Sequence, residues 1–167
     1  MKYLFTTVFV MMLSLSAMAQ MPKVVLNDIN GKAVSLDSIG NQGYPVIIDF
    51  FATWCKPCNR ELSAIAEVYD EWQEETGVRV VAISIDQAQN IHKVKPLVEE
   101  NAWPWETVLL DPNSEVKRAL GIQMIPYTFI IDGKGNIVHN KFRYTFQHRR
   151  ELSGHCHDDN KIRCIYR

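Results

Sequence analysis

Hydrophobic and polar positions change along the chain in blocks that predict a succession of strands and helices. Apolar runs over 24–26 and 33–36 flank a polar stretch whose Asn-Gly pair at 30–31 suits a tight turn, so they predict an N-terminal β-hairpin. Residues 46–51 are apolar at every position except Asp49, which is typical of a central strand buried on both faces. The carboxylate is an anomaly within that strand.

The next blocks predict a helix and a second strand. Apolar residues recur at helical spacing between 62 and 72, while acidic residues, Glu61 among them, fill the opposite face, so we expect one long amphipathic helix. Gly77 is expected to end this helix, and the β-branched run over 78–85 predicts the second strand. A strand, a helix and a strand in this order imply a right-handed parallel crossover.

Shorter elements are predicted in the second half of the chain. The pattern indicates a helix over 91–98, a strand over 107–110, a brief helix over 114–120, and a hairpin of the strands 127–131 and 136–138. Pro96 must either kink its helix or mark a late start, because proline lacks a backbone donor. Ser114 is expected to cap the brief helix, and Gly121 to close it in the left-handed conformation.

Two cysteines lie two residues apart where the central strand ends and the long helix begins, in the sequence Trp-Cys-Lys-Pro-Cys-Asn-Arg-Glu at 54–61. At the helix N-terminus, unpaired N–H groups and the macrodipole favour a thiolate on Cys55, and Cys58 lies one turn further within bonding reach. We therefore expect Cys55 to attack a disulfide and Cys58 to resolve the mixed disulfide. Lys56 adds positive charge and Pro57 fixes φ, so both are expected to tune the redox potential.

Other interpretations of these residues stay open at this point. The cysteine pair could be a static structural disulfide or half of a metal site, although such a site normally needs a second ligand pair. Trp54 either shields the thiols and shapes the substrate surface beside them, or packs in the core or at its rim. Trp103 and Trp105 are expected to pack against the sheet rather than to form a patch for a partner.

Composition and charge limit the class of protein. With 47% hydrophobic and 22% charged residues, the chain has enough apolar residues for one core, and we expect no cofactor. Residues 21–140 carry 10 Lys and Arg against 16 Asp and Glu, whereas residues 141–167 carry 7 against 3. Because a nucleic-acid groove requires basic residues clustered in the folded body, we exclude nucleic-acid binding.

The two ends of the chain differ from its body. Residues 1–19 combine a positive start, an apolar stretch and an Ala-Met-Ala cleavage signature, which predicts a secretory signal. An uncleaved membrane anchor is the alternative. The change of composition after Asn140 leaves an atypical tail over 141–167, so the predicted domain covers 20–140. The tail carries Cys156 and Cys164, which could pair or stay free, and its His and Cys residues lack the spacing of a metal site, so no metal is expected.

Three segments occur in an order that resembles the thioredoxin superfamily, and specifically its exported TlpA-like (ResA-like) thiol-disulfide oxidoreductases. They are Asp-Phe-Phe-Ala-Thr-Trp-Cys-Lys-Pro-Cys at 49–58, the strand at 80–86, and Ile-Pro-Tyr-Thr-Phe-Ile-Ile-Asp at 125–132. The resemblance covers about 24–140. It implies an α/β, thioredoxin-like fold with a central mixed sheet, helices on both faces and the N-terminal β-hairpin. The final helix usual in the family is doubtful here.

The resemblance also implies roles for individual residues. Pro126 would follow a cis peptide bond, and Ile125 would offer its backbone to an extended substrate beside the thiols. Cys55 would be exposed. Asp49 matches the buried acid that precedes the thiols in thioredoxins; burial is expected to raise its pKa and let it relay a proton for Cys58. The alternative for Asp49 is an acid at a strand end that reaches water or caps a turn.

An activity and a location follow from the resemblance. It implies an exported, periplasmic enzyme, tethered to the membrane if the signal is not cleaved. Such an enzyme would reduce disulfides of exported proteins, apocytochromes among them, with electrons from a membrane thiol reductant. The alternatives are net oxidation or isomerisation of disulfides, and a non-catalytic copper- or peptide-binding module on the same scaffold. Peroxidase chemistry is not expected, because a peroxidatic cysteine would not need the close second thiol.

Overall fold

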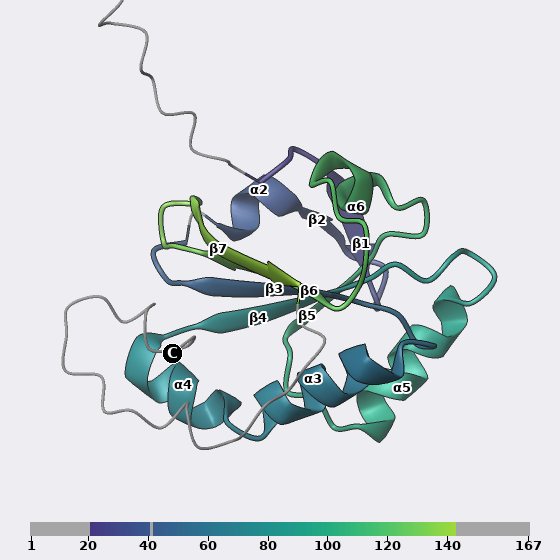
Figure 1. The fold of residues 1–167 in the computed structure, drawn as a ribbon, viewed down its shortest axis with the longest axis horizontal. Helices are drawn as coiled ribbons and strands as arrows, with labels where there is room; N and C mark the ends of the chain where they lie inside the picture. Colours follow the sequence, from purple (N-terminus) through teal and green to yellow (C-terminus); the bar gives the residue numbers. More distant parts are fainter. Residues whose placement is uncertain (1–20, 41, 143–167) are drawn as a thin grey trace, which may run out of the picture.

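The computed structural model describes residues 21–40 and 42–142 (Figure 1). Its strands are β1 (Val25–Asp28), β2 (Ala33–Ser35), β3 (Val46–Phe51), β4 (Arg79–Ser84), β5 (Thr107–Leu110), β6 (Tyr127–Ile131) and β7 (Ile137–Phe142). Its helices are α2 (Leu36–Ile39), α3 (Lys56–Ala66), α4 (Tyr69–Thr76), α5 (Val94–Glu100) and α6 (Glu115–Ala119), with a 3-10 turn, η1 (Ile91–Lys93), before α5. The predicted signal over 1–19, and the cysteines and histidines of the tail, lie outside the described residues.

The strands form one mixed sheet in the order β2-β1-β5-β4-β3-β6-β7. The neighbours β3, β4 and β5 run parallel, whereas β1 pairs antiparallel with β2 and β5, and β6 pairs antiparallel with β3 and β7. Helices α3, α4 and α5 lie on one face of the sheet and α2 and α6 on the other (Figure 1). The predicted thioredoxin-like architecture, with its N-terminal hairpin and its parallel crossover, is confirmed.

Strand β3 is the centre of the core, as its apolar run predicts. All six of its residues are buried, because β4 and β6 flank it and helices cover both faces. Phe51 packs edge-on against Trp103 with ring centroids 5.8 Å apart, and Trp105 packs edge-on against Tyr69 at 5.2 Å. Both tryptophans are buried, so their predicted packing in the core is confirmed.

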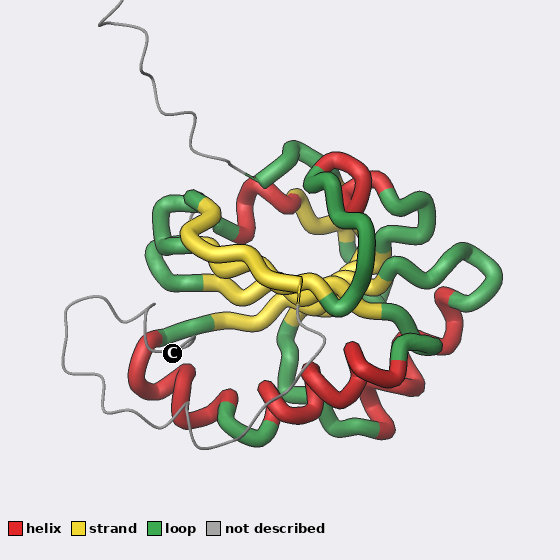
Figure 2. Tube along the Cα trace, in the orientation of Figure 1, coloured by secondary structure: helices red, strands yellow, loops and turns green. Residues whose placement is uncertain are grey.

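The single long helix expected after the cysteines is wrong, because the chain forms two helices, α3 and α4, separated by a short turn (Figure 2). Val68 leaves the helical conformation with φ −117° and ψ 3°, and its N–H bonds to Ile65 O at 3.2 Å instead of continuing the regular ladder. The buried positions 62, 65, 69 and 72 keep the same spacing across this turn. Their periodicity therefore could not reveal the break.

Other local expectations are confirmed or corrected. Gly77 and Gly121 have positive φ, 71° and 66°, as expected of residues that end helices. Pro96 lies in the first turn of α5, where its missing N–H has no helical partner to lose, so the late start is confirmed. Leu36 begins helix α2 rather than ending a strand, because Leu36 and Ile39, one turn apart, are both buried.

Ser114 does not cap helix α6 with its side chain. It lies at the N-cap position in the left-handed region, with φ 53° and ψ 37°, and its hydroxyl makes no capping hydrogen bond. The carboxylate of Asp111 takes that role, because it accepts the backbone N–H of Glu115 at 2.7 Å and that of Lys117 at 3.0 Å. The helix start is therefore capped from the end of β5 rather than from the adjacent residue.

Candidate active site

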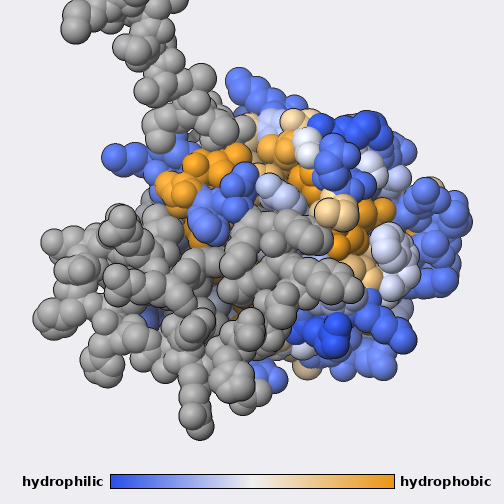
Figure 3. All heavy atoms as spheres, viewed as in Figure 1, coloured by the Kyte–Doolittle hydropathy of each residue, from blue (hydrophilic) through white to orange (hydrophobic). Residues whose placement is uncertain are grey.

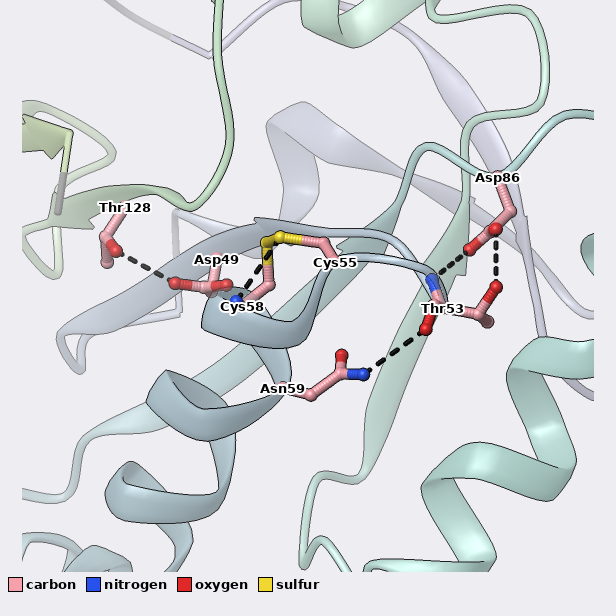
Figure 4. The surroundings of a disulfide bond; sticks show 7 residues. All are labelled: Asp49, Thr53, Cys55, Cys58, Asn59, Asp86 and Thr128. Carbon is pink, nitrogen blue, oxygen red and sulfur yellow. Dashed lines mark hydrogen bonds between the residues drawn. A yellow bond between two sulfur atoms is a disulfide. The ribbon is translucent and has the colours of Figure 1, made fainter. Parts of the chain in front are cut away.

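The two cysteines of the motif form a disulfide at the start of α3, with their Cα atoms 5.3 Å apart (Figure 4). Cys55 is the N-cap residue, and its Sγ accepts the backbone N–H of Cys58 at 3.3 Å. The turn before it is closed by Cys55 N donating to Ala52 O at 3.0 Å. Pro57 is the second helical residue, where its fixed φ suits a helix start. The sulfur of Cys55 thus lies where helix donors favour an anion.

The resemblance implies an exposed Cys55, but Cys55 is buried in this disulfide form, with only 5% of its surface accessible. Cys58 is fully buried. Trp54, next in the chain, is 65% exposed and occupies the surface instead. Burial of Trp54 in the core is therefore excluded, whereas packing at the rim of the core and a role in substrate binding both stay predictions.

Asp49 is fully buried in the middle of β3, so the alternative of an acid at a strand end that reaches water is wrong. It lies directly opposite Thr128 of β6 in the antiparallel register, and Thr128 Oγ1 donates to Asp49 Oδ2 at 2.8 Å. In the view of Figure 4 the carboxyl of Asp49 is drawn between Thr128 and Cys58. The raised pKa expected for Asp49 stays a prediction.

Glu61 is a second buried acid at this place, although the sequence pattern put it on the polar face of the helix. It is 4% exposed, and Thr128 Oγ1 lies 3.4 Å from its Oε1. The signal that could have found it is its spacing, because Glu61 lies three residues after Cys58 and four before Ile65, both on the buried face of α3. Thr128 was missed because only the pairing of β3 with β6 brings it to Asp49.

The peptide bond between Ile125 and Pro126 is cis, as the resemblance implies. Phe50 of β3 pairs with Tyr127 of β6, so continuing this antiparallel register beyond both strands brings Ile125 and Pro126 beside the segment that leads to Cys55. Two segments that are far apart in the sequence therefore lie side by side at this end of the sheet.

Large apolar side chains on the described surface include one next to the cis bond. Met124 is 60% exposed and directly precedes Ile125, a feature that the sequence reading missed. Figure 3 shows apolar side chains gathered on the face that carries β6 and β7, among polar surroundings. Trp54, next to Cys55 in the chain, and Met124, next to Ile125, are thus both large apolar side chains at the surface.

Lys56 and Pro57 begin α3 between the two cysteines, as expected, and their effect on the redox potential stays a prediction. Within residues 21–40 and 42–142, no group of three or more His, Cys, Asp or Glu side chains could hold a metal ion. In the same part of the chain, no helix is long and apolar enough to cross a lipid bilayer.

Comparison with known proteins places this site in a family. The model of the AhpC/TSA family matches residues 18–140, which include both cysteines, Asp49 and the cis-proline segment. The chain belongs to the AhpC/TSA family. Among the relatives within it, the thiol-disulfide oxidoreductase ResA of Bacillus subtilis is 30% identical over 136 residues, which cover 81% of this chain and 72% of ResA. The chain spans 64% of the length of ResA from Bacillus thuringiensis, which is also 30% identical.

Solved structures of similar proteins have the same fold. A thioredoxin-like protein from Porphyromonas gingivalis is 51% identical, with a TM-score of 0.72 over 89% of this chain and 92% of that one. A putative thiol:disulfide interchange protein DsbE from Chlorobium tepidum is 27% identical, with a TM-score of 0.63 over 78% of this chain and 89% of that one. The thioredoxin-like fold and the resemblance to ResA-like proteins are thus confirmed.

Proposed function

We propose that this AhpC/TSA family member is an exported thiol-disulfide oxidoreductase that reduces disulfides of other exported proteins through Cys55 and Cys58. The observation that carries the proposal is the disulfide at the N-cap of α3, where Cys55 Sγ accepts the backbone N–H of Cys58. Its similarity to ResA and to a DsbE-like interchange protein supports the same chemistry.

The reaction transfers two electrons to the client protein. In the reduced enzyme, the Cys55 thiolate attacks one sulfur of the client disulfide, and the other client sulfur leaves as a thiolate. The Cys58 thiolate then attacks Cys55 Sγ, which forms the Cys55–Cys58 disulfide and releases the second client thiolate. A membrane thiol reductant is proposed to return the enzyme to the dithiol form by the same two exchanges in reverse.

The second attack needs a base inside the protein. Cys58 is fully buried, so its thiol proton must pass to a protein group before the sulfur can attack. Asp49 is proposed to receive it. Thr128 has a single hydroxyl proton and lies within reach of the carboxyl groups of both Asp49 and Glu61. Two buried carboxyl groups, those of Asp49 and Glu61, thus share one hydroxyl as a neighbour.

Client binding is proposed to use the apolar surface and the free backbone beside the disulfide. Trp54 and Met124 are largely exposed, and Ile125 precedes the cis bond. An extended client segment could pair with the backbone at Ile125 in the manner of strand addition. Exposed aromatic and sulfur-containing side chains adapt to varied apolar surfaces. This arrangement suits an enzyme that acts on several unfolded clients, of which apocytochromes are the class implied by the resemblance.

Export depends on residues 1–19, whose charge pattern and Ala-Met-Ala sequence support a cleaved signal and a periplasmic location. Disulfides persist in that compartment, so a reducing enzyme there would have substrates. Expression of the full chain in a bacterial host followed by fractionation tests this part. We expect a mature protein that lacks about the first 19 residues in the periplasm; an unprocessed protein in the cytoplasm would contradict export.

The direction of electron flow is tested by the reduction potential of Cys55 and Cys58. Thioredoxin, which reduces disulfides, has a reduction potential of about −270 mV, whereas a periplasmic oxidant has a reduction potential of about −120 mV. Equilibration with dithiothreitol redox buffers, followed by mass spectrometry of alkylated peptides, gives the value. A potential closer to the reducing value, together with insulin reduction that requires both cysteines, supports the proposal. A potential near that of the oxidants would instead favour net oxidation or isomerisation.

A further inference from the structure

A buried carboxylate at the end of β4 binds the turn that leads to the dithiol. Asp86, two residues beyond β4, is 1% exposed. It accepts the backbone N–H of Thr53 and the Thr53 hydroxyl, both at 2.7 Å (Figure 4). It also accepts the Ser84 hydroxyl at 2.9 Å. Asp86 and Thr53 are 33 residues apart in the sequence. One side chain thus satisfies two donors of a residue that immediately precedes Trp54 and Cys55.

Thr53 is also held from the opposite side. Its carbonyl oxygen accepts a hydrogen bond from Asn59 Nδ2, on the second turn of α3, at 3.3 Å. Backbone groups in a turn that lose their protein partners turn toward water. The conformation of 52–55, and with it the position of the Cys55 sulfur, therefore depends on bonds made at Thr53.

We propose that Asp86 is a positioning residue for thiol-disulfide exchange, which fixes the turn at Thr53 so that the Cys55 sulfur stays over the N–H groups at the start of α3. The inference rests on the proposed role of Cys55 as the attacking thiolate. It goes beyond that role because it assigns part of the thiolate's stability to a carboxylate on another strand. Asp86 acts through Thr53 and touches neither sulfur in the bonds described.

Geometry and charge make opposite predictions for Asp86, which makes the role testable. A negative charge near the dithiol disfavours a thiolate, so its removal by charge alone would move the ionisation of Cys55 to lower pH. Loss of positioning would move it to higher pH, because the thiolate would lose its helix donors. Thr53→Val removes one of the bonds without changing any charge, so only the positioning effect applies to it.

Asp111 provides a matched control at the neighbouring strand end. It follows β5 as Asp86 follows β4, it is equally buried, and its carboxylate also accepts two donors of a following segment. Those donors belong to α6 rather than to the dithiol turn. Asp111→Ala therefore removes a comparable buried carboxylate and tests whether general loosening of the fold alters Cys55. Thr53→Ser is the second control, because it keeps the hydroxyl.

The experiment measures the rate at which iodoacetamide alkylates Cys55 in the reduced full chain between pH 5 and 10. Fragmentation of the peptide that carries both Cys55 and Cys58, by tandem mass spectrometry, shows which of the two is alkylated. The ionisable groups placed around the dithiol, Asp49, Lys56 and Glu61, are the same in every variant. For Asp86→Ala and Thr53→Val we expect a midpoint at higher pH, a rate about three- to tenfold lower at pH 7 and an unchanged plateau at high pH. Thr53→Ser and Asp111→Ala are expected to match the wild type.

The outcomes separate the two proposals. The role of Asp86 would be overturned, with Cys55 still the nucleophile, if the alkylation midpoints of Asp86→Ala and Thr53→Val both equalled that of the wild type. It would also be overturned if Asp111→Ala shifted the midpoint as much as Asp86→Ala does. A wild-type midpoint at the ordinary thiol value of about 8.5 would overturn the role of Cys55 and that of Asp86 with it. If circular dichroism shows that Asp86→Ala does not fold, the Thr53 variants decide the matter, since Thr53→Val replaces only the hydroxyl and Thr53→Ser removes only the methyl group.

Discussion

Helices α3 and α6 both follow a parallel strand of the same sheet, yet their first turns are completed by different groups. At α6 the carboxylate of Asp111 accepts two backbone N–H groups, at 2.7 and 3.0 Å. At α3 the corresponding acceptor is the Cys55 sulfur, 3.3 Å from the N–H of Cys58. The carboxylate of Asp111 takes no part in bond exchange, whereas the sulfur can become an anion and a nucleophile when the disulfide is reduced. The same helix geometry thus holds the structure at one site and is proposed to support exchange at the other.

The largest effect is expected from replacing the sulfur at α3. Cys55→Ser keeps an oxygen that can cap the helix, so the fold should persist, while insulin reduction should fall by about 10³-fold or more. Cys58→Ser is the matched variant, because it leaves the first attack intact. It should accumulate a mixed disulfide with the client, visible as an added mass. Substantial turnover by Cys55→Ser would show that the helix-start sulfur is not the nucleophile.

A smaller kinetic effect is expected at the buried acids. Asp49→Asn should slow release of the client from the mixed disulfide by about 10²-fold at neutral pH, because Cys58 loses its proposed proton acceptor. Stopped-flow measurement of the mixed-disulfide intermediate isolates this step. Thr128→Ser serves as a control, since it retains the hydroxyl that bonds Asp49. Unchanged kinetics in Asp49→Asn across pH 6 to 9 would remove Asp49 from the mechanism.

Asp111 tests the structural side of the comparison. Its replacement by Ala leaves two N–H groups at the start of α6 without their carboxylate, which should lower the free energy of unfolding by about 1–3 kcal/mol. Urea denaturation measures this loss. Insulin reduction by the folded variant should stay at the wild-type rate. A clearly lower rate of insulin reduction by the folded variant would mean that the two helix starts are not independent.

The smallest effect is expected at Asp132, in the turn between β6 and β7, whose carboxylate is held by hydrogen bonds as that of Asp111 is. Burial raises its pKa, but hydrogen bonds from the Asn136 side chain and from the N–H groups of Asn136 and Lys134 outweigh this, so the pKa is lowered. A lowered pKa adds stability above the unfolded value of about 3.9 and loses it as pH falls through the folded value.

Asp132→Asn should therefore be less stable than the wild type near neutral pH, and the difference should shrink below pH 4. Urea midpoints measured between pH 2 and 6 check this. A difference that is constant across that range would mean that Asp132 acts through shape rather than through charge.

Much of the fold follows from the order of apolar residues, because burial on both faces of β3 leaves a continuous apolar run in the sequence. The cysteine pair and Asp49 are also visible in the sequence, because Asp49 interrupts this apolar run and the cysteines follow directly after it. Glu61 was misplaced because acidic residues surround it, although its spacing from Cys58 puts it on the buried face. The other contacts of the site cannot be predicted from the sequence, because they join residues far apart in the chain. Strand pairing brings Thr128 to Asp49, and the segment after β4 brings Asp86 to Thr53.

The tryptophans show a related limit of sequence reasoning. Trp54 and Trp103 have equally apolar side chains, yet one is largely exposed and the other is buried with its Nε1 donating to Ser63 Oγ at 3.0 Å. Their neighbours in the sequence do not decide this. Trp103 faces Phe51 across the space between α3 and the sheet, whereas Trp54 lies in the turn outside that space.

The central claim is that Cys55, at the start of α3, is the thiol that attacks. The most direct test follows the alkylation of Cys55 and of Cys58 separately against pH in the reduced wild-type chain. We expect Cys55 to react faster than Cys58 and to reach half its maximal rate below the ordinary thiol pKa of about 8.5. Faster reaction of Cys58, or a Cys55 midpoint at or above that value, would contradict it.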